Sequence, residues 1–270
     1  MKTRWIAVIS LILCLACAAC LTEAEKLTDG VYEGFYAQPT YLIRATVTVQ
    51  DGVVTEVDYE ECHDPNYWAT LTADEAAALS ADEYIEVPGA RGTTYYARHA
   101  VVGAGDEAIC LTASGDGTAM PVYGNDEIAD FVEWLKESPE NDAWYYAQLS
   151  AGNYWVVLSD GTKLENLAVY TNTLKDGTQL SKEQARFKTM VRHWTAVGTG
   201  VGIESGELGW QGNMDVLAAA LVESQFPQGE RSKNEDGKVV IADVVTGATI
   251  ESYQDYLAAA YAAYDLAAGK

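Results

Sequence analysis

The residues best suited to chemistry lie close to the C-terminus, in the segment DVVTGAT that covers residues 243–249. A short β-branched run at residues 238–241 precedes this segment and predicts a strand. Apolar residues at helical spacing follow it, namely Ile250, Tyr253, Leu257, Tyr261 and Tyr264. The pattern therefore predicts a strand, a tight loop and a helix, with Thr249 at or next to the N-terminus of that helix.

A helix N-terminus at Thr249 would favour a phosphate on its hydroxyl group. Unpaired backbone N–H groups and the positive end of the helix dipole would face such a group. Gly247 and Ala248 would keep the approach free of bulky side chains. The same residues are also consistent with Thr249 acting only as an ordinary helix cap. Spacing alone therefore leaves two interpretations open, a phosphate site and a helix cap.

The segment resembles the attachment motif of the FMN-binding domain family, which occurs in flavinylated subunits of membrane redox pumps and in extracellular electron-transfer lipoproteins. The residues that match the motif are Asp243, Thr246, Gly247, Ala248, Thr249 and Ser252. In that family a flavin transferase uses FAD to esterify FMN to the last threonine of the motif. The resemblance thus implies covalent FMN on Thr249 and an electron carrier, rather than a stand-alone enzyme, that serves membrane or extracellular redox partners.

A second class of function is consistent with the same residues. The chain contains 7 tryptophans and 17 tyrosines, which could contact a glycan or a peptide. In that interpretation the protein is a non-redox surface lipoprotein, and the TGAT sequence only caps a helix. Attachment of flavin to the chain would distinguish the two classes.

The first residues of the chain predict export. Residues 1–19 carry two positive charges, then an apolar run shorter than the roughly 20 residues of a membrane-spanning helix, then small residues. We therefore expect a signal peptide, with lipidation at Cys20 or, as an alternative, at Cys17. Residues 20–27 would form a tether from the lipid bilayer. The acyl chain would hold the protein at the outer face of the bacterial cytoplasmic membrane, in the periplasm or at the cell surface.

The net charge bears on the class of binding partner, and the cysteine content bears on disulfide formation. With 17 basic and 40 acidic residues, the formal net charge of −23 argues against nucleic acid as a partner. Cys62 and Cys110 remain as an even pair once the leader and a lipidated Cys20 are set aside, which predicts a disulfide in an oxidising compartment. Two buried thiols are the alternative.

Two hairpin signals suggest an internal duplication. Asp-Gly pairs at residues 51–52 and 160–161 each lie between alternating apolar runs, and helix capping boxes follow at residues 72–75 and 181–184. Both pairs of signals are separated by 109 residues, since 160 − 51 = 109 and 181 − 72 = 109. Asn125 and Asn213 are expected to cap a later helix in each copy.

We therefore predict an α+β fold with two similar units resembling FMN-binding domains, residues 28–140 and residues 141–270. Each would pair an antiparallel hairpin or sheet with helices. Gln148 stands where the duplication would place the acceptor threonine, so only the second unit would carry the attachment motif.

Overall fold

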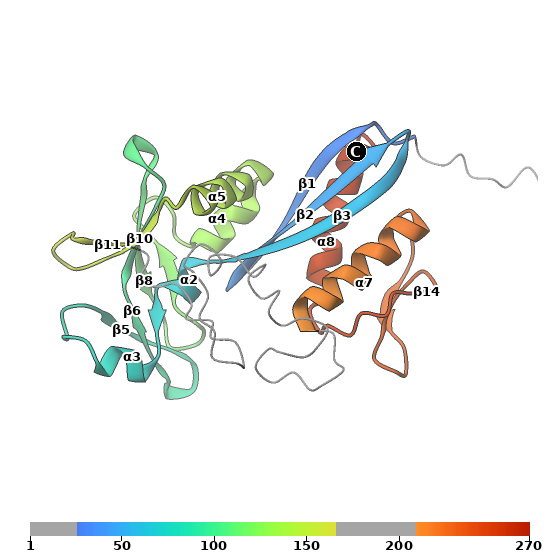
Figure 1. Cartoon of the computed structure of the whole chain (residues 1–270). Helices are drawn as coiled ribbons and strands as arrows, with labels where there is room; N and C mark the ends of the chain where they lie inside the picture. Colours follow the sequence, from blue (N-terminus) through green and yellow to red (C-terminus); the bar gives the residue numbers. More distant parts are fainter. Residues whose placement is uncertain (1–25, 166–208) are drawn as a thin grey trace, which may run out of the picture.

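The computed structural model describes residues 26–165 and 209–270, and these residues form an α+β fold with four small antiparallel sheets (Figure 1). They pack into two hydrophobic cores. One core joins the N-terminal sheet to the C-terminal helices, and we call residues 26–63 and 209–270 the terminal unit. The second core lies mainly within residues 64–165, which we call the inserted unit.

The terminal unit is founded on the sheet β1-β2-β3, formed by β1 (Gly30–Gln38), β2 (Tyr41–Gln50) and β3 (Val53–His63). The predicted alternation is confirmed, because every second residue of β2 from Ile43 to Val49 is buried. The predicted hairpin is also confirmed: Asp51 and Gly52 both have left-handed φ angles, 54° and 76°, as a tight two-residue turn requires. One face of this sheet is therefore apolar and needs a cover.

Helices α7 (Gly209–Ser224) and α8 (Tyr253–Ala267) supply that cover (Figure 1). Helix α8 contacts β1 and β2, and α7 contacts β3. Helix α8 lies so close to β1 that a Cβ atom on Gly34 would collide with the backbone of Ala259 and Ala263. The shared core includes Val47, Val57, Leu217, Leu221, Tyr256 and Leu257. Burying these side chains provides the main stabilisation of the terminal unit.

This shared core corrects the predicted division of the chain at residues 140 and 141. Residues 28–63 were expected to belong to the first unit and residues 209–270 to the second, yet they pack together. A strand exposes one apolar face, and nothing in its sequence specifies which later helix will cover it. Leu27, expected in the tether, is also buried in this core, and Thr28 donates its N–H to the carbonyl oxygen of Ala267.

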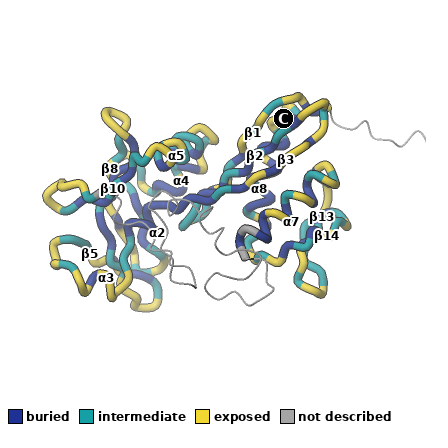
Figure 2. Tube along the Cα trace, viewed as in Figure 1, coloured by how far each residue is buried: buried dark blue, intermediate teal, exposed yellow. Residues whose placement is uncertain are grey.

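The inserted unit contains a five-stranded sheet of order β11-β10-β7-β8-β9 and a three-stranded sheet of order β4-β6-β5. The first comprises β7 (His99–Val102), β8 (Ile109–Ser114), β9 (Val122–Gly124), β10 (Tyr154–Val157) and β11 (Lys163–Glu165). The second comprises β4 (Thr70–Leu71), β5 (Ile85–Pro88) and β6 (Thr94–Ala97). Figure 2 shows buried backbone running through both units, with exposed loops at their edges.

Short helices complete the inserted unit. They are α2 (Pro65–Trp68), α3 (Ala73–Ala77), α4 (Phe131–Glu137) and α5 (Pro139–Ala151), with 3₁₀ turns at Ala90–Gly92 and Gly105–Glu107. The β2–β3 ladder reaches this unit, because Leu42 and Cys62 pair at its far end and are buried in the second core. The two units are therefore joined through a continuous pair of strands.

The duplication is not shown by the structure. The second predicted hairpin is present as β10 and β11 around residues 160–161, and Thr72 and Glu75 form the predicted capping box. However, the first hairpin lies in a sheet with β1, whereas the second joins the sheet of β7. The capping box predicted at residues 181–184 lies outside the described residues.

The two asparagine caps were also predicted wrongly. Helix α4 begins at Phe131 and is capped by Asp130, whose side chain accepts from the N–H groups of Val132 and Glu133. Asn125 instead accepts from the N–H of Glu127 and Ile128 within a loop. Asn213 lies inside α7 rather than at its start. Asparagine satisfies nearby backbone donors in loops as readily as at helix ends, which explains the error at Asn125.

The predicted disulfide between Cys62 and Cys110 is not formed, and both thiols are free. Cys62 is fully buried in the second core, whereas Cys110 is exposed on β8 next to the buried Leu111. Burial raises the pKa of the Cys62 thiol well above its usual value, which keeps it protonated. The predicted leader, Cys17 and Cys20 lie outside the described residues. Within residues 26–165 and 209–270, no helix is long and apolar enough to cross a membrane.

Candidate functional site

The TGAT loop follows a small sheet made of β12 (Arg231–Lys233), β13 (Val239–Ile241) and β14 (Val244–Val245). Residues 242 and 243 make the turn from β13 to β14, and both have left-handed φ angles, 45° for Ala242 and 74° for Asp243. Asp243 is exposed there. Aspartate tolerates this conformation better than most residues, so in this structure Asp243 shapes the turn that leads into the loop.

The loop itself is anchored around the start of β13. The N–H and the hydroxyl of Thr246 both donate to the carbonyl oxygen of Val239, at 2.9 and 3.1 Å. The N–H of Val239 donates to the carbonyl oxygen of Ala248 at 2.7 Å, and the N–H of Ala248 donates to the Thr246 hydroxyl at 3.1 Å. Thr246 is 7% exposed and Ala248 is fully buried. These two residues of the motif are therefore structural anchors.

Gly247 makes the reversal between the two anchors possible. Its φ angle is 85°, in the left-handed region that side chains with a Cβ atom avoid. A Cβ atom there would only touch Val216, at 3.9 Å, so the backbone angle and not crowding requires glycine.

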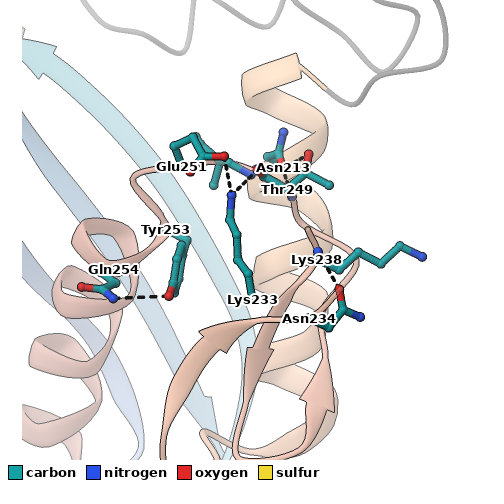
Figure 3. Close-up of polar contacts among 9 residues, drawn as sticks. Asn213, Lys233, Asn234, Lys238, Thr249, Glu251, Tyr253 and Gln254 are labelled. Carbon is teal, nitrogen blue, oxygen red and sulfur yellow. Dashed lines mark hydrogen bonds and ion pairs between the residues drawn. The ribbon is translucent and has the colours of Figure 1, made fainter. Parts of the chain in front are cut away.

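Thr249 is exposed at the end of the loop and is held by Asn213 of α7 (Figure 3). The side-chain oxygen of Asn213 accepts from the N–H groups of Thr249 and Ile250, at 2.6 and 3.0 Å. The Thr249 hydroxyl lies 3.4 Å from the same oxygen. Asn213 is only 7% exposed, so one buried amide fixes the backbone that presents the Thr249 hydroxyl.

The helix after the loop begins later than predicted. Helix α8 starts at Tyr253 with Ser252 at its N-cap, and the Ser252 side chain makes no capping hydrogen bond. Thr249 is thus separated from the helix, and the N–H groups of Thr249 and Ile250 are already paired with Asn213. The expected cradle of free N–H groups around Thr249 is a wrong prediction, because a buried side chain of α7 satisfies those donors first.

A lysine supplies positive charge next to Thr249 instead. The Nζ atom of Lys233 donates to the carbonyl oxygen of Thr249 at 2.9 Å and pairs with the Glu251 carboxylate at 2.7 Å (Figure 3). The Lys233 side chain is 20% exposed, whereas that of Glu251 is 95% exposed. Sequence reasoning missed both Lys233 and the role of Asn213; the polar Asn213 within the otherwise apolar stripe of α7 was the available signal.

A network of aromatic and acidic residues holds α8 in place behind the loop. The Tyr256 hydroxyl donates to the buried carboxylate of Glu61 at 2.5 Å and accepts from the indole N–H of Trp210 at 2.9 Å. Burial, with the Glu61 carboxylate nearby, raises the pKa of Tyr256 well above its usual value. At the start of the same helix, Asp255 accepts from the Tyr41 hydroxyl at 2.7 Å. The segment that follows Thr249 is therefore tied to both β2 and β3.

These residues fit an FMN phosphoester in three respects. The Thr249 hydroxyl is on an exposed residue, the Lys233 ammonium group contacts the Thr249 carbonyl oxygen and the Glu251 carboxylate, and a groove with both apolar and polar walls runs along the same loop. The groove has a volume of about 530 Å³. Its apolar walls are Val216, Ala219, Ala220, Val244 and Val245, and its polar walls are Glu223, Ser224 and Thr246. A hydroxyl acceptor, a compensating cation and an apolar surface are what a phosphate-linked aromatic cofactor needs.

The other predicted residues do not form a second site. Gln148, aligned with Thr249 by the duplication hypothesis, lies on α5, where its side chain accepts from Asn153 at 2.9 Å. In the part of the chain that the structure describes, no cluster of three or more histidine, cysteine, aspartate or glutamate residues could hold a metal ion. The chain matches no family model, no curated protein and no solved structure.

Proposed function

We propose that this chain is an extracytoplasmic electron-transfer flavoprotein that carries FMN as a phosphoester on Thr249. The observation that supports it best is the exposed Thr249 hydroxyl, held by the buried Asn213 at the end of a TGAT loop. A flavin transferase would attach FMN from FAD, which links the motif to the family that it resembles. Thr249 is an acceptor of modification in this proposal and not a catalytic nucleophile.

The neighbouring residues would have distinct tasks. Thr246 and Ala248 fix the loop, Asn213 orients the backbone of Thr249, and Lys233 would offset the negative charge of the phosphoester. FMN when bound would supply one- and two-electron redox chemistry, which no side chain of the loop provides. The protein would position the cofactor and set its electrostatic surroundings.

Covalent attachment suits the proposed location. Outside the cytoplasm a dissociated cofactor is lost by dilution, whereas a phosphoester keeps it on the chain. Lipidation at Cys20 would keep the protein near membrane redox partners at the outer face of the cytoplasmic membrane or at the cell surface. The strongly acidic composition fits a soluble domain displayed there.

Co-expression with a flavin transferase tests the proposal. We expect one flavin per chain that survives denaturation, seen as fluorescence of the denatured band and as a mass increase of one FMN less one water. Thr249→Ser keeps a hydroxyl and should retain the label, whereas Thr249→Ala should lose it. Thr55→Ala removes another exposed threonine hydroxyl, on β3, and should leave labelling unchanged.

Two results would contradict the proposal. A colourless, unmodified chain in the presence of a transferase that labels a control substrate would reject covalent flavin. A label that persists in Thr249→Ala would reject Thr249 as the acceptor. In the first case the glycan- or peptide-binding alternative would gain support.

A further inference from the structure

Arg98 of the inserted unit is a buried cation that has no carboxylate partner among the described residues. It lies between β6 and β7, and it is only 5% exposed. Its backbone is well fixed, since its N–H donates to Ala69 and its carbonyl oxygen accepts from the Tyr123 hydroxyl, both at 2.9 Å. Among residues 26–165 and 209–270, however, no carboxylate pairs with its guanidinium, and Nε has no hydrogen-bond partner.

An unpaired guanidinium is unfavourable at this depth. Buried charges in proteins are normally paired, and arginine does not escape the cost by losing its proton. The five N–H donors of arginine match the two oxygens of a carboxylate. A small anion that reached Arg98 would satisfy guanidinium donors, Nε among them, that are unpaired within residues 26–165 and 209–270.

Arg98 lines a cavity that such an anion could enter. The cavity has a volume of about 250 Å³ and is walled by residues 81–85, by residues 97–99, and by Val157 and Ser159 of the strand β10 and the loop after it. The Ser159 hydroxyl donates to the carbonyl oxygen of Asp82 at 3.3 Å, which links two of these walls. The ring of Tyr84 packs edge-on against Tyr96, at 5.4 Å between centroids.

The rim of the cavity carries negative charge, opposite to that of Arg98. Asp82 is exposed, and Glu83 uses one carboxylate oxygen to accept from the N–H of Ser80 at 2.9 Å. Two acidic groups would repel a dianion but would attract a cationic group on the ligand. Ile85 and Val157 add apolar surface to the lining of the same cavity.

We propose that this cavity binds a small zwitterion of the α-amino acid class. Its carboxylate would pair with Arg98, its ammonium group would face Asp82 and Glu83, and its side chain would contact Ile85 and Val157. This site is separate from the proposed flavin attachment at Thr249, and nothing in it depends on flavin. The inserted unit would then be a ligand-binding module within the sequence of the terminal unit.

Isothermal titration calorimetry of the full chain tests this site. The probes are L-alanine, L-valine and L-phenylalanine, with propionate and inorganic phosphate as anions that lack the ammonium group. We expect saturable binding of at least one amino acid, tighter than that of propionate or phosphate. No binding of any amino acid at millimolar concentration, or tighter binding of propionate or phosphate, would overturn the proposal.

Variants assign the roles of the residues. Arg98→Met should weaken amino acid binding about 10- to 100-fold, the range for lost hydrogen bonds to a charged group. The same variant should raise the melting temperature of the ligand-free protein, because it removes an unpaired buried charge. A purely structural arginine would lower it. Unchanged binding by a folded Arg98→Met protein would also overturn the proposal.

The rim variants keep the test valid if Arg98→Met does not fold. Asp82→Asn and Glu83→Gln should each weaken amino acid binding about two- to fivefold, as expected for an exposed ion pair, without weakening propionate binding. Asp106→Asn, an exposed acid away from the cavity, is the matched control and should have no effect. Equal losses for the amino acid and for propionate would refute the ammonium contact.

Discussion

Replacing Asn213 tests how the Thr249 loop is held. Asn213→Ala removes an acceptor that binds two backbone N–H groups, at 2.6 and 3.0 Å, and a hydroxyl at 3.4 Å, too long to contribute much. Net contributions of about 0.5–1.5 kcal/mol per hydrogen bond give a loss of about 1–3 kcal/mol. Because Thr249 is exposed, water can replace part of the lost hydrogen bonding, so we expect a loss near the middle of this range, about 2 kcal/mol.

Hydrogen exchange measures this loss where it occurs. A local destabilisation of about 2 kcal/mol corresponds to roughly 30-fold faster exchange of the Thr249 and Ile250 amides. The amide of Val239, which donates to Ala248 in the same loop, should accelerate less because its acceptor is unchanged. Glu223→Ala, an exposed residue on the same helix, is the control. Unchanged exchange at Thr249 and Ile250 in a folded Asn213→Ala protein would refute the assignment of Asn213 as the residue that holds the loop.

Two further predictions concern the loop and the inserted unit. Gly247→Ala places a Cβ atom at a φ of 85° and should lower the free energy of urea unfolding by about 1–2 kcal/mol; an unchanged midpoint would show that the loop relaxes freely. Burial raises the pKa of Asp142 to about 7. Between about pH 4 and about pH 7 the folded state therefore holds a proton that the unfolded state has released. The unfolding free energy should fall as the pH rises through this range. Asp142→Asn should reduce this decline in unfolding free energy with pH. The remaining decline would come from Asp64, which is also buried and has a raised pKa. Equal pH dependence of the unfolding free energy in variant and parent would exclude Asp142 as a cause.

The sequence patterns predicted the structure correctly where the stabilising interaction joins residues that are close in sequence. The alternation in β2, the left-handed pair at Asp51 and Gly52, and the capping box of Thr72 and Glu75 each involve neighbours in sequence. The physical reason is that period, turn angle and cap are determined within a few residues. The division into units failed because helices α7 and α8 cover a sheet formed by residues far away in sequence.

The candidate site shows the same distinction. The sequence by itself determined the TGAT motif and the resemblance that implies flavin on Thr249, whereas the left-handed φ angle that requires glycine at residue 247 came from the structure. Only the tertiary structure decided that Asn213 takes the N–H groups predicted to face a phosphate and that Lys233 lies beside Thr249. It also decided that Arg98 is buried with no carboxylate partner in the described part of the chain. Those contacts join segments brought together by the burial of apolar surface, which is not directional, so local sequence does not specify which polar groups meet.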